Sequence, residues 1–321
     1  MGWLMQFPTF RLLEFEASSG EQRTKMAQEL DTICRDTGFL LLDDHGVPEH
    51  IIAAQWEVVA RFFACPVTEK QKVAAPYAGY PYGWLGPNQE ALAASKGEKT
   101  PPDLKESFNG GPLSIPENIA DTRAYEFCYQ PTLWPDIEGF KEAWCRYYKA
   151  MEDLAKRVMA ALGEALGLAR SYFDPFLSQP ISALRALHYP ATAERAEVGQ
   201  QRAGAHTDYG SLTILLPQSG RSGLQISHQG EWIDVPAPAG CFVINIGDLM
   251  EHWTSGRWVS TLHRVAAQPN QLSRKSLAFF HQPNWEAQIT PINNNNGKTV
   301  VSGPYLMDNS KALIYRFLKK V

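Results

Sequence analysis

The hydrophobic pattern of the chain changes its period once, near residue 181. Before that point, apolar residues recur every three or four positions in three segments, which predicts amphipathic helices. We expect helices over about 21–35, from about Pro48 to Phe63, and over about 140–166, with Gly167 as the C-terminal cap of the last. The third segment is the longest, and we expect it to pack along the outside of a sheet.

After about Ile181 the period becomes two, which predicts strands. Glycine and proline separate these short apolar runs, as they do in all-β sandwiches and barrels. The pattern is typical of a double-sheet jelly roll, and the mouth of such a structure is a natural place for a ligand. The predicted strands cover 184–189, 212–216, 224–227, 232–235, 241–246, 261–267 and 276–280.

The remaining segments carry weaker signals. Residues 39–42 are a short apolar run that suits a buried strand, and residues 305–321 are expected to form a final helix. Residues 75–88 are rich in Gly, Pro, Tyr and Trp and are expected to form a loop or an edge strand. The aromatic part of that segment, Tyr77–Trp84, could be surface packing or a lid over a substrate. Residues 94–135 are expected to be irregular.

No repeat and no clear linker divides the chain. The change of period predicts a helix-rich region over 1–175 and a β-rich core with a C-terminal helix over 176–321. A length of 321 residues fits one large catalytic unit, and 44% hydrophobic and 20% charged residues are ordinary for a soluble globular protein.

Charge, apolar runs and cysteine content indicate which partners and which cell compartment to expect. A net charge of −4 gives no reason to expect nucleic acid. No apolar run approaches the roughly 18 residues that span a bilayer, and the N-terminus has no basic segment followed by a long apolar stretch. The five cysteines are scattered without Cys-x-x-Cys spacing, which indicates reduced thiols. We therefore expect a cytoplasmic protein with no membrane partner.

A candidate metal site stands out in the β-rich half. His206 and Asp208 are one residue apart, so in an extended strand both side chains project to the same side. A third donor, His263, follows after 54 intervening residues. Two neutral imidazoles and one carboxylate, with the other positions of the metal open, suit non-haem Fe(II) and its reaction with oxygen. Zinc would also be possible on the donors alone.

A candidate anion site follows in the sequence. Arg274 and Ser276 share one face of a predicted strand and offer a guanidinium and a hydroxyl to a carboxylate. Ala278 and Phe280 lie on the same face, which therefore changes from polar to apolar along the strand. A charge on an inner face needs a partner, because an unpaired buried charge is costly.

Three other histidines lack a carboxylate at metal-ligand spacing. We predict that they are not ligands, although the last of them could line the mouth of a pocket. They are His188, His252 and His281.

The ordered set His-x-Asp, His and Arg-x-Ser resembles the Fe(II)/2-oxoglutarate-dependent dioxygenases, in particular the isopenicillin N synthase-like branch. The N-terminal half resembles the same branch, and the similarity runs from about Phe7 to about Asn284. The segments that carry it are Asp36–Leu42, Asp44–Pro48, Arg61–Phe63 and Asp103–Phe108.

The resemblance implies a fold and a metal. The fold would be mainly β with flanking helices, a double-stranded β-helix (jelly-roll) core braced by N-terminal helices. Fe(II) would be the metal, held by His206, Asp208 and His263.

The resemblance also implies the sites for co-substrate and substrate. The 5-carboxylate of 2-oxoglutarate would be held by Arg274, Ser276 and Tyr189, and Phe280 would contact the substrate. One position departs from the pattern: many plant-type relatives have asparagine two positions before the tyrosine, and this chain has Leu187.

The activity implied is oxidation of a C–H bond of a small molecule by O2, most simply hydroxylation, with release of succinate and CO2. One alternative is an oxidase of the isopenicillin N synthase type, which uses O2 without 2-oxoglutarate. Another is a non-catalytic ligand-binding barrel, because fold does not fix function. The sequence indicates neither the substrate nor the oligomeric state.

Overall fold

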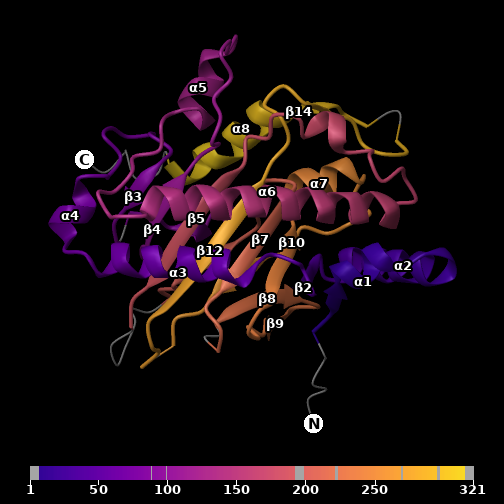
Figure 1. Cartoon of the computed structure of the whole chain (residues 1–321), viewed down its shortest axis with the longest axis horizontal. Helices are drawn as coiled ribbons and strands as arrows, with labels where there is room; N and C mark the ends of the chain where they lie inside the picture. The colour runs from indigo at the N-terminus through magenta and orange to yellow at the C-terminus, as the bar shows by residue number, and fades with distance from the viewer. Residues whose placement is uncertain are drawn as a thin grey trace.

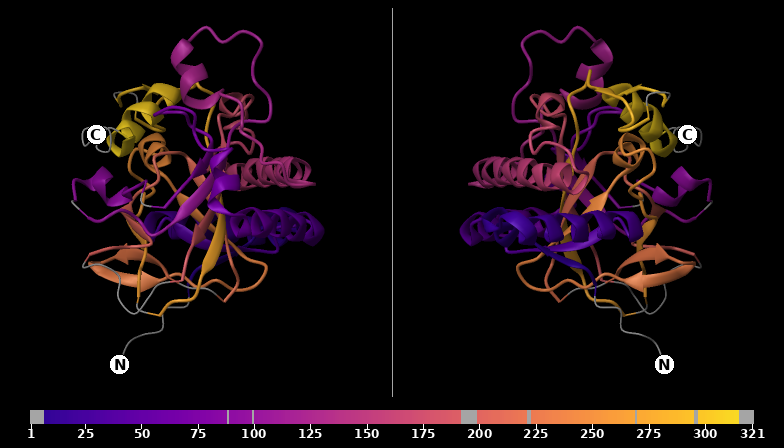
Figure 2. Two further views of the ribbon diagram at one scale, coloured as in Figure 1. Left: turned by 90° about the vertical axis from the view of Figure 1, so that its left-hand side faces the viewer. Right: turned by 90° about the vertical axis from the view of Figure 1, so that its right-hand side faces the viewer.

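The computed structural model describes residues 7–87, 89–98, 100–191, 199–220, 223–268, 270–294 and 297–314. The described elements form three layers: long helices, a large sheet and a small sheet (Figure 1). In both views of Figure 2 the long helices lie on one side of the large sheet, and the small sheet lies on the other. Among the described residues, none of the helices has the length and apolar character to cross a bilayer.

The large sheet combines strands from both halves of the chain. In the described residues its order is β1-β2-β10-β7-β12-β5-β4-β3, with a parallel pair only at β1 and β2. The first four strands of the sequence therefore extend the sheet at its two ends. Their bounds and those of the central strands are β1 Thr9–Arg11, β2 Phe39–Asp43, β10 Phe242–Ile246, β7 Leu212–Pro217, β12 Arg274–His281, β5 Ala183–Tyr189, β4 Glu106–Gly110 and β3 Gly83–Leu85.

The small sheet is antiparallel and has the order β6-β11-β8-β9 in the described part of the chain. A further short hairpin pairs β13 with β14. The two facing sheets form the predicted double-stranded β-helix. The strand bounds are β6 Ala203–His206, β11 His263–Val265, β8 Leu224–His228, β9 Glu231–Asp234, β13 Gln288–Ile289 and β14 Val300–Val301.

The helical layer covers the outer face of the large sheet. Its longest member, α6 (Phe140–Ala165), buries an apolar face that includes Trp144 and Tyr148. Gly167 follows it in the left-handed region at φ +74°, a conformation that glycine adopts without strain. The prediction of a long helix braced against the sheet is confirmed. The other helices are α1 Leu12–Ala17, α2 Gly20–Asp36, α3 Glu49–Ala64, α4 Val67–Gln71, η1 Leu92–Lys96, α5 Thr122–Cys128, η2 Asp174–Phe176, α7 Asp248–Trp253 and α8 Ser302–Ile314.

Strand alternation sorts side chains into two cores. Leu277 and Phe279 of β12 point into the core between the helices and the large sheet, whereas Ala278 and Phe280 point toward the small sheet. The small sheet contributes Val265 and other apolar residues to this second, inter-sheet cluster. Residues on the inward faces of both sheets therefore converge in one space.

Four segments differ from the sequence-based expectations. Residues 94–135 were expected to be irregular, but they contain β4 and α5. His206 and Asp208 were expected to share one strand, but β6 ends at His206 and Asp208 lies beyond it. Tyr82 and Trp84 are buried and donate hydrogen bonds to Cys128 and Glu106, which makes them parts of the fold. The final helix begins at residue 302, and the predicted stretch 315–321 lies outside the described residues.

Candidate active site

The two candidate histidine ligands are direct neighbours in the small sheet. His206 is the last residue of β6, His263 is the first of β11, and the two are paired in the antiparallel register. Their ring centroids are 4.3 Å apart. η1 packs closely against β6, since a Cβ on Gly204 would lie 2.7 Å from the backbone nitrogen of Ala93. Glycine at position 204 thus allows η1 to cover the strand that carries His206.

Backbone hydrogen bonds orient both imidazoles. The Nδ1 of His206 lies 2.7 Å from the carbonyl oxygen of Gly204, and the Nδ1 of His263 lies 3.0 Å from that of Thr261. A carbonyl only accepts, so each Nδ1 must carry the proton. Each Nε2 therefore keeps a lone pair, which is the form that binds a metal. Burial and the neighbouring His263 lower the pKa of His206 to about 3, so its ring is neutral near pH 7.

The carboxylate of Asp208 is also oriented by its neighbours. Its Oδ2 accepts hydrogen bonds from Thr213 Oγ1 at 2.6 Å and from Asn245 Nδ2 at 2.7 Å. Burial acts to raise the pKa of Asp208, but the two histidines and these hydrogen bonds outweigh it, so the pKa lies below its usual value. The remaining oxygen, Oδ1, is the one that faces the histidines.

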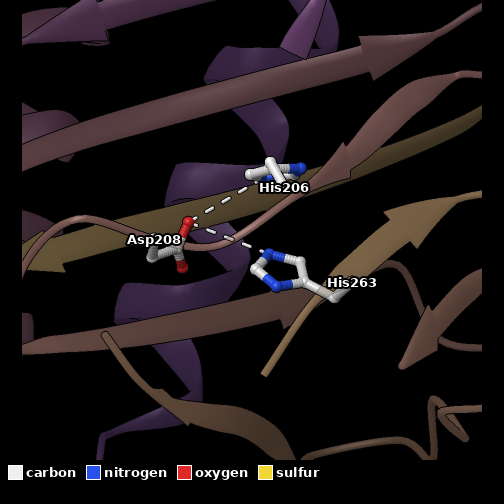
Figure 3. A group of neighbouring side chains, drawn as sticks. All are labelled: His206, Asp208 and His263. Atoms are coloured by element: carbon white, nitrogen blue, oxygen red, sulfur yellow. Dashed lines mark ion pairs between the residues drawn. The ribbon is translucent and has the colours of Figure 1, made fainter. Parts of the chain in front are cut away.

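The three donors surround a common space (Figure 3). Asp208 Oδ1 lies 3.8 Å from the Nε2 of His206 and 3.8 Å from the Nε2 of His263, too far for a hydrogen bond. Donor atoms of all three residues lie within 4.8 Å of one another, and among the described residues this is the one such group of His, Cys, Asp and Glu. Two neutral imidazoles and a carboxylate suit Fe(II).

The candidate anion anchor lies farther along the inner face of the large sheet. Arg274 is 1% exposed and is paired in register with Tyr189, whose ring lies 4.9 Å from the guanidinium carbon. Burial lowers the pKa of Arg274, but the group stays charged. Its Nε and Nη1 have no hydrogen-bond partner among the described residues. Ser276, also 1% exposed, is two residues along the same face. A buried guanidinium with free donors is suited to an anionic ligand.

Two further side chains lie on the inward face of the large sheet. Phe280 is partly buried against the inter-sheet cluster and is paired in register with Thr213. Because Thr213 donates a hydrogen bond to Asp208, Phe280 lies near the carboxylate of Asp208. Leu187 is buried in the same cluster and is paired with Ser276.

The three remaining candidate histidines make contacts elsewhere. His188 lies between Glu106 and Ser273, at 2.8 and 3.0 Å. His252, on α7, contacts the carbonyl of Lys298. His281 points to the helical side of β12, where it stacks on Phe279 and contacts Ser182, so it does not line the inter-sheet space.

A partly buried polar pair interrupts the apolar inner face of the large sheet. Arg185 of β5 is directly opposite Asn109 of β4, in the row that continues through Ala278 and Leu215. Arg185 donates to Glu90 and to Ser107. Its Nε and the Oδ1 of Asn109 are buried without a partner among the described residues. These two atoms offer one donor and one acceptor.

Several of these residues were not indicated by the sequence. A polar residue inside the apolar strand Phe242–Ile246 was the available signal for Asn245. Asp103 had no local signal: its Oδ1 accepts from the backbone nitrogen of Gly204, whose carbonyl orients His206. Contacts over about a hundred residues cannot be read from periodicity.

Comparison with known proteins identifies the family. A model of the 2OG-Fe(II) oxygenase superfamily matches residues 180–283, and a model of the non-haem dioxygenase in morphine synthesis N-terminal region matches residues 7–137. The 2-oxoglutarate-Fe(II) type oxidoreductase hxnY of Emericella nidulans is 31% identical over 288 residues, which cover 86% of this chain and 79% of that protein. The chain belongs to the 2-oxoglutarate- and Fe(II)-dependent oxygenase superfamily.

Two further proteins that are similar to this chain are a dioxygenase and a protein crystallised with alpha-KG. Validamycin A dioxygenase of Streptomyces hygroscopicus is 32% identical over 292 residues, which cover 89% of this chain and 79% of that protein. The crystal structure of a full-length Neurospora crassa protein in complex with alpha-KG and thymine has a TM-score of 0.81 and 28% identity, and the match covers 95% of this chain and 96% of that one. The protein is thus an enzyme that uses Fe(II) and 2-oxoglutarate to oxidise a small molecule. This is the activity implied by the sequence resemblance, and not that of an oxidase without 2-oxoglutarate or of a non-catalytic barrel.

Proposed function

We propose that His206, Asp208 and His263 hold the Fe(II) of this oxygenase. The observation that carries the proposal is the convergence of Oδ1 and two unprotonated Nε2 atoms on one space. The chemistry supplied by bound Fe(II) is the coupling of O2-dependent decarboxylation of 2-oxoglutarate to oxidation of a substrate C–H bond. The chain itself orients the donors through Gly204, Thr261 and the hydrogen bonds to Asp208.

Arg274, Ser276 and Tyr189 are proposed to hold the 5-carboxylate of 2-oxoglutarate. Support comes from the burial of all three side chains and from the free guanidinium donors of Arg274. A charge-assisted fork of this kind would fix the direction of the co-substrate relative to the metal donors.

The substrate is proposed to lie beside Phe280 and to carry an uncharged polar group toward Arg185 and Asn109. Glu90 already balances the charge of Arg185, and its pKa is lowered to about 2 because Arg185 and Lys105 outweigh its burial. A carbonyl next to an N–H, as in a cyclic amide, would satisfy the free donor of Arg185 and the free acceptor of Asn109 together. Thymine has such an edge, so pyrimidine-like rings are sensible first candidates. Hydroxylation is the expected outcome.

The test of this function is co-substrate binding under anaerobic conditions. 2-Oxoglutarate is titrated into the protein in the presence and absence of Mn(II), which replaces Fe(II) without reacting. We expect tight binding only when the metal and Asp208 are both present. Equal binding by an Asp208→Ala variant would contradict the assignment of the metal site.

We also propose that the protein works in the cytoplasm. All five cysteines are unpaired, which fits a reducing compartment. Thiol titration of the unfolded chain should find five reactive groups, and a count of one or three would contradict this location.

A further inference from the structure

A second arginine, Arg202, is buried near the candidate anion anchor. Arg202 and Arg274 are each 1% exposed and are among the largest fully buried side chains of the described residues. Arg202 directly precedes β6, and the backbone nitrogen of Arg202 donates to the carbonyl of Val265 across the small sheet. The pairing of β6 with β11 is irregular between Ala203 and His206, so the direction of the Arg202 side chain follows from its own hydrogen bonds.

Hydrogen bonds fix the position of the Arg202 guanidinium. Its Nη2 donates to the carbonyl oxygens of Pro190, at 2.9 Å, and of Leu272, at 2.8 Å. Pro190 directly follows Tyr189, and Leu272 lies two residues before Arg274. The guanidinium of Arg202 therefore lies where β5 and β12 meet at the anchor. Burial and the positive charge of Arg274 lower the pKa of Arg202, which is further evidence that the two cations are close.

The two charges have no counter-charge in the part of the chain that the structure describes. The described partners of Arg202 are backbone carbonyls, and its Nε has none. Arg274 has two free donors, Nε and Nη1. Burial of two neighbouring cations is unfavourable unless an anion joins them. The anchor therefore holds more positive charge than Arg274 alone would supply.

We propose that Arg202 is a second cation of the co-substrate site, which acts with Arg274 on the 5-carboxylate of 2-oxoglutarate. The inference rests on the proposed function of the Arg274 site and adds a residue from the opposite sheet. Arg202 joins the strand of the proposed metal donor His206 to the two loops that border the anchor. Its charge selects a 2-oxo acid with an anionic tail over one of equal size with a neutral tail.

The test compares two ligands that share the 2-oxo acid group and differ in the charge of the tail. 2-Oxoglutarate and its 5-methyl ester, which has a neutral tail, are titrated anaerobically into the Mn(II)-loaded protein, and the ratio of their dissociation constants is measured. Arg202→Gln removes the charge but keeps a donor for the loop carbonyls, whereas Arg202→Lys keeps the charge. Arg264→Gln is the matched control, because Arg264 is on the neighbouring strand β11 and its guanidinium stacks on Trp232.

We expect Arg202→Gln to weaken 2-oxoglutarate binding roughly ten- to a hundredfold while it leaves binding of the ester nearly unchanged. Arg202→Lys should keep most of the preference, and Arg264→Gln all of it. Equal weakening of both ligands by Arg202→Gln would overturn the proposal and leave Arg202 as a brace between loops, and so would no weakening of either. Should Arg202→Gln fail to fold, loss of the preference in a folded Arg202→Lys variant would overturn it as well. If the wild-type protein binds neither ligand, the proposed function itself fails first.

Discussion

Each candidate histidine ligand uses one ring nitrogen for the backbone and leaves the other for the metal. The carbonyls of Gly204 and Thr261 fix the tautomers, and Asp208 is oriented in the same way through its second oxygen. At the scale of single residues, hydrogen bonds from the chain itself therefore orient all three proposed donors.

Removal of one metal donor should abolish metal binding. His263→Ala leaves only His206 and Asp208, and two donors rarely hold Fe(II) against water. We expect no stoichiometric Mn(II) or Fe(II) in this variant by elemental analysis after gel filtration. His252→Ala is the control, because His252 contacts the Lys298 carbonyl outside the site. Retention of metal by His263→Ala would refute its role as a ligand.

The anchor residues should differ in their effect on 2-oxoglutarate. Loss of one partner from a buried charged pair costs about 2–5 kcal/mol, so Arg274→Ala should raise the dissociation constant more than tenfold. Arg274→Lys should be intermediate, because lysine lacks the planar fork. Ser276→Ala and Tyr189→Phe each remove one neutral donor and should cost about 1 kcal/mol. Calorimetry gives the order, and an unchanged affinity in Arg274→Ala would contradict it.

At the scale of elements, the large sheet supports a site whose proposed metal donors lie on or next to strands of the small sheet. β7 and β10 lie side by side, and their residues Thr213 and Asn245 are paired in register and both donate to Asp208. Asp208 lies beyond the end of β6, and its carboxylate is oriented by these two strands of the other sheet.

Disruption of this support should weaken metal binding without loss of any ligand. Loss of a hydrogen bond to a metal-binding side chain typically lowers metal affinity roughly ten- to a hundredfold. We expect a decrease of about this size in Mn(II) affinity for Asn245→Ala and for Thr213→Val. Asn309→Ala on α8 is the control, since Asn309 bonds only to its own helix among the described contacts. Mn(II) titration measures the effect. Wild-type affinity in both variants would show that the orientation of Asp208 is set elsewhere.

The sequence predicts these elements unequally. The period of α6 and the alternation of β5, β7 and β12 are strong enough to indicate helix, strands and inner face, because burial on one side imposes the pattern. β4 carries only one large apolar residue, Phe108, in five and forms through long-range pairing with β5. The sequence pattern also gives no indication of the proposed roles of Arg202 and Asn109, because these roles depend on neighbours that are distant in the sequence.

At the scale of the whole molecule, the N-terminal helices are joined to the β core by an ionic contact between a buried carboxylate and a partly exposed arginine. Asp31 of α2 accepts hydrogen bonds from Arg257 Nε and Nη2 and from Trp258 Nε1, each at 2.9 Å. Trp258 is fully buried in the core between the helices and the large sheet. The contact therefore ties the helical layer to the segment that leads to His263.

Replacement of Asp31 should destabilise the protein in a pH-dependent way. Burial acts to raise the pKa of Asp31, but the bonds to Arg257 and Trp258 outweigh it and the pKa is lowered. The stabilisation is therefore present above the unfolded-state pKa of about 3.9 and is lost as the pH falls through the lower folded-state value. Asp31→Asn should lower the unfolding free energy by about 1–3 kcal/mol at pH 7, since Arg257 is partly exposed.

Urea unfolding at pH 7 and at successively lower pH measures this difference, with Glu29→Gln as the control on the exposed face of the same helix. The difference between wild type and Asp31→Asn should shrink as the solution becomes acidic. A difference that is constant over the whole range would contradict the assigned ion pair.

The most direct test of the whole account is succinate release during substrate oxidation. Wild-type protein with Fe(II), O2 and 2-oxoglutarate is screened against small molecules that carry a cyclic amide, and succinate is measured beside the oxidised product. We expect one succinate for each substrate oxidised, and no product when 2-oxoglutarate is omitted or when His263 is replaced by alanine. Product formed with O2 alone, without 2-oxoglutarate, would contradict it.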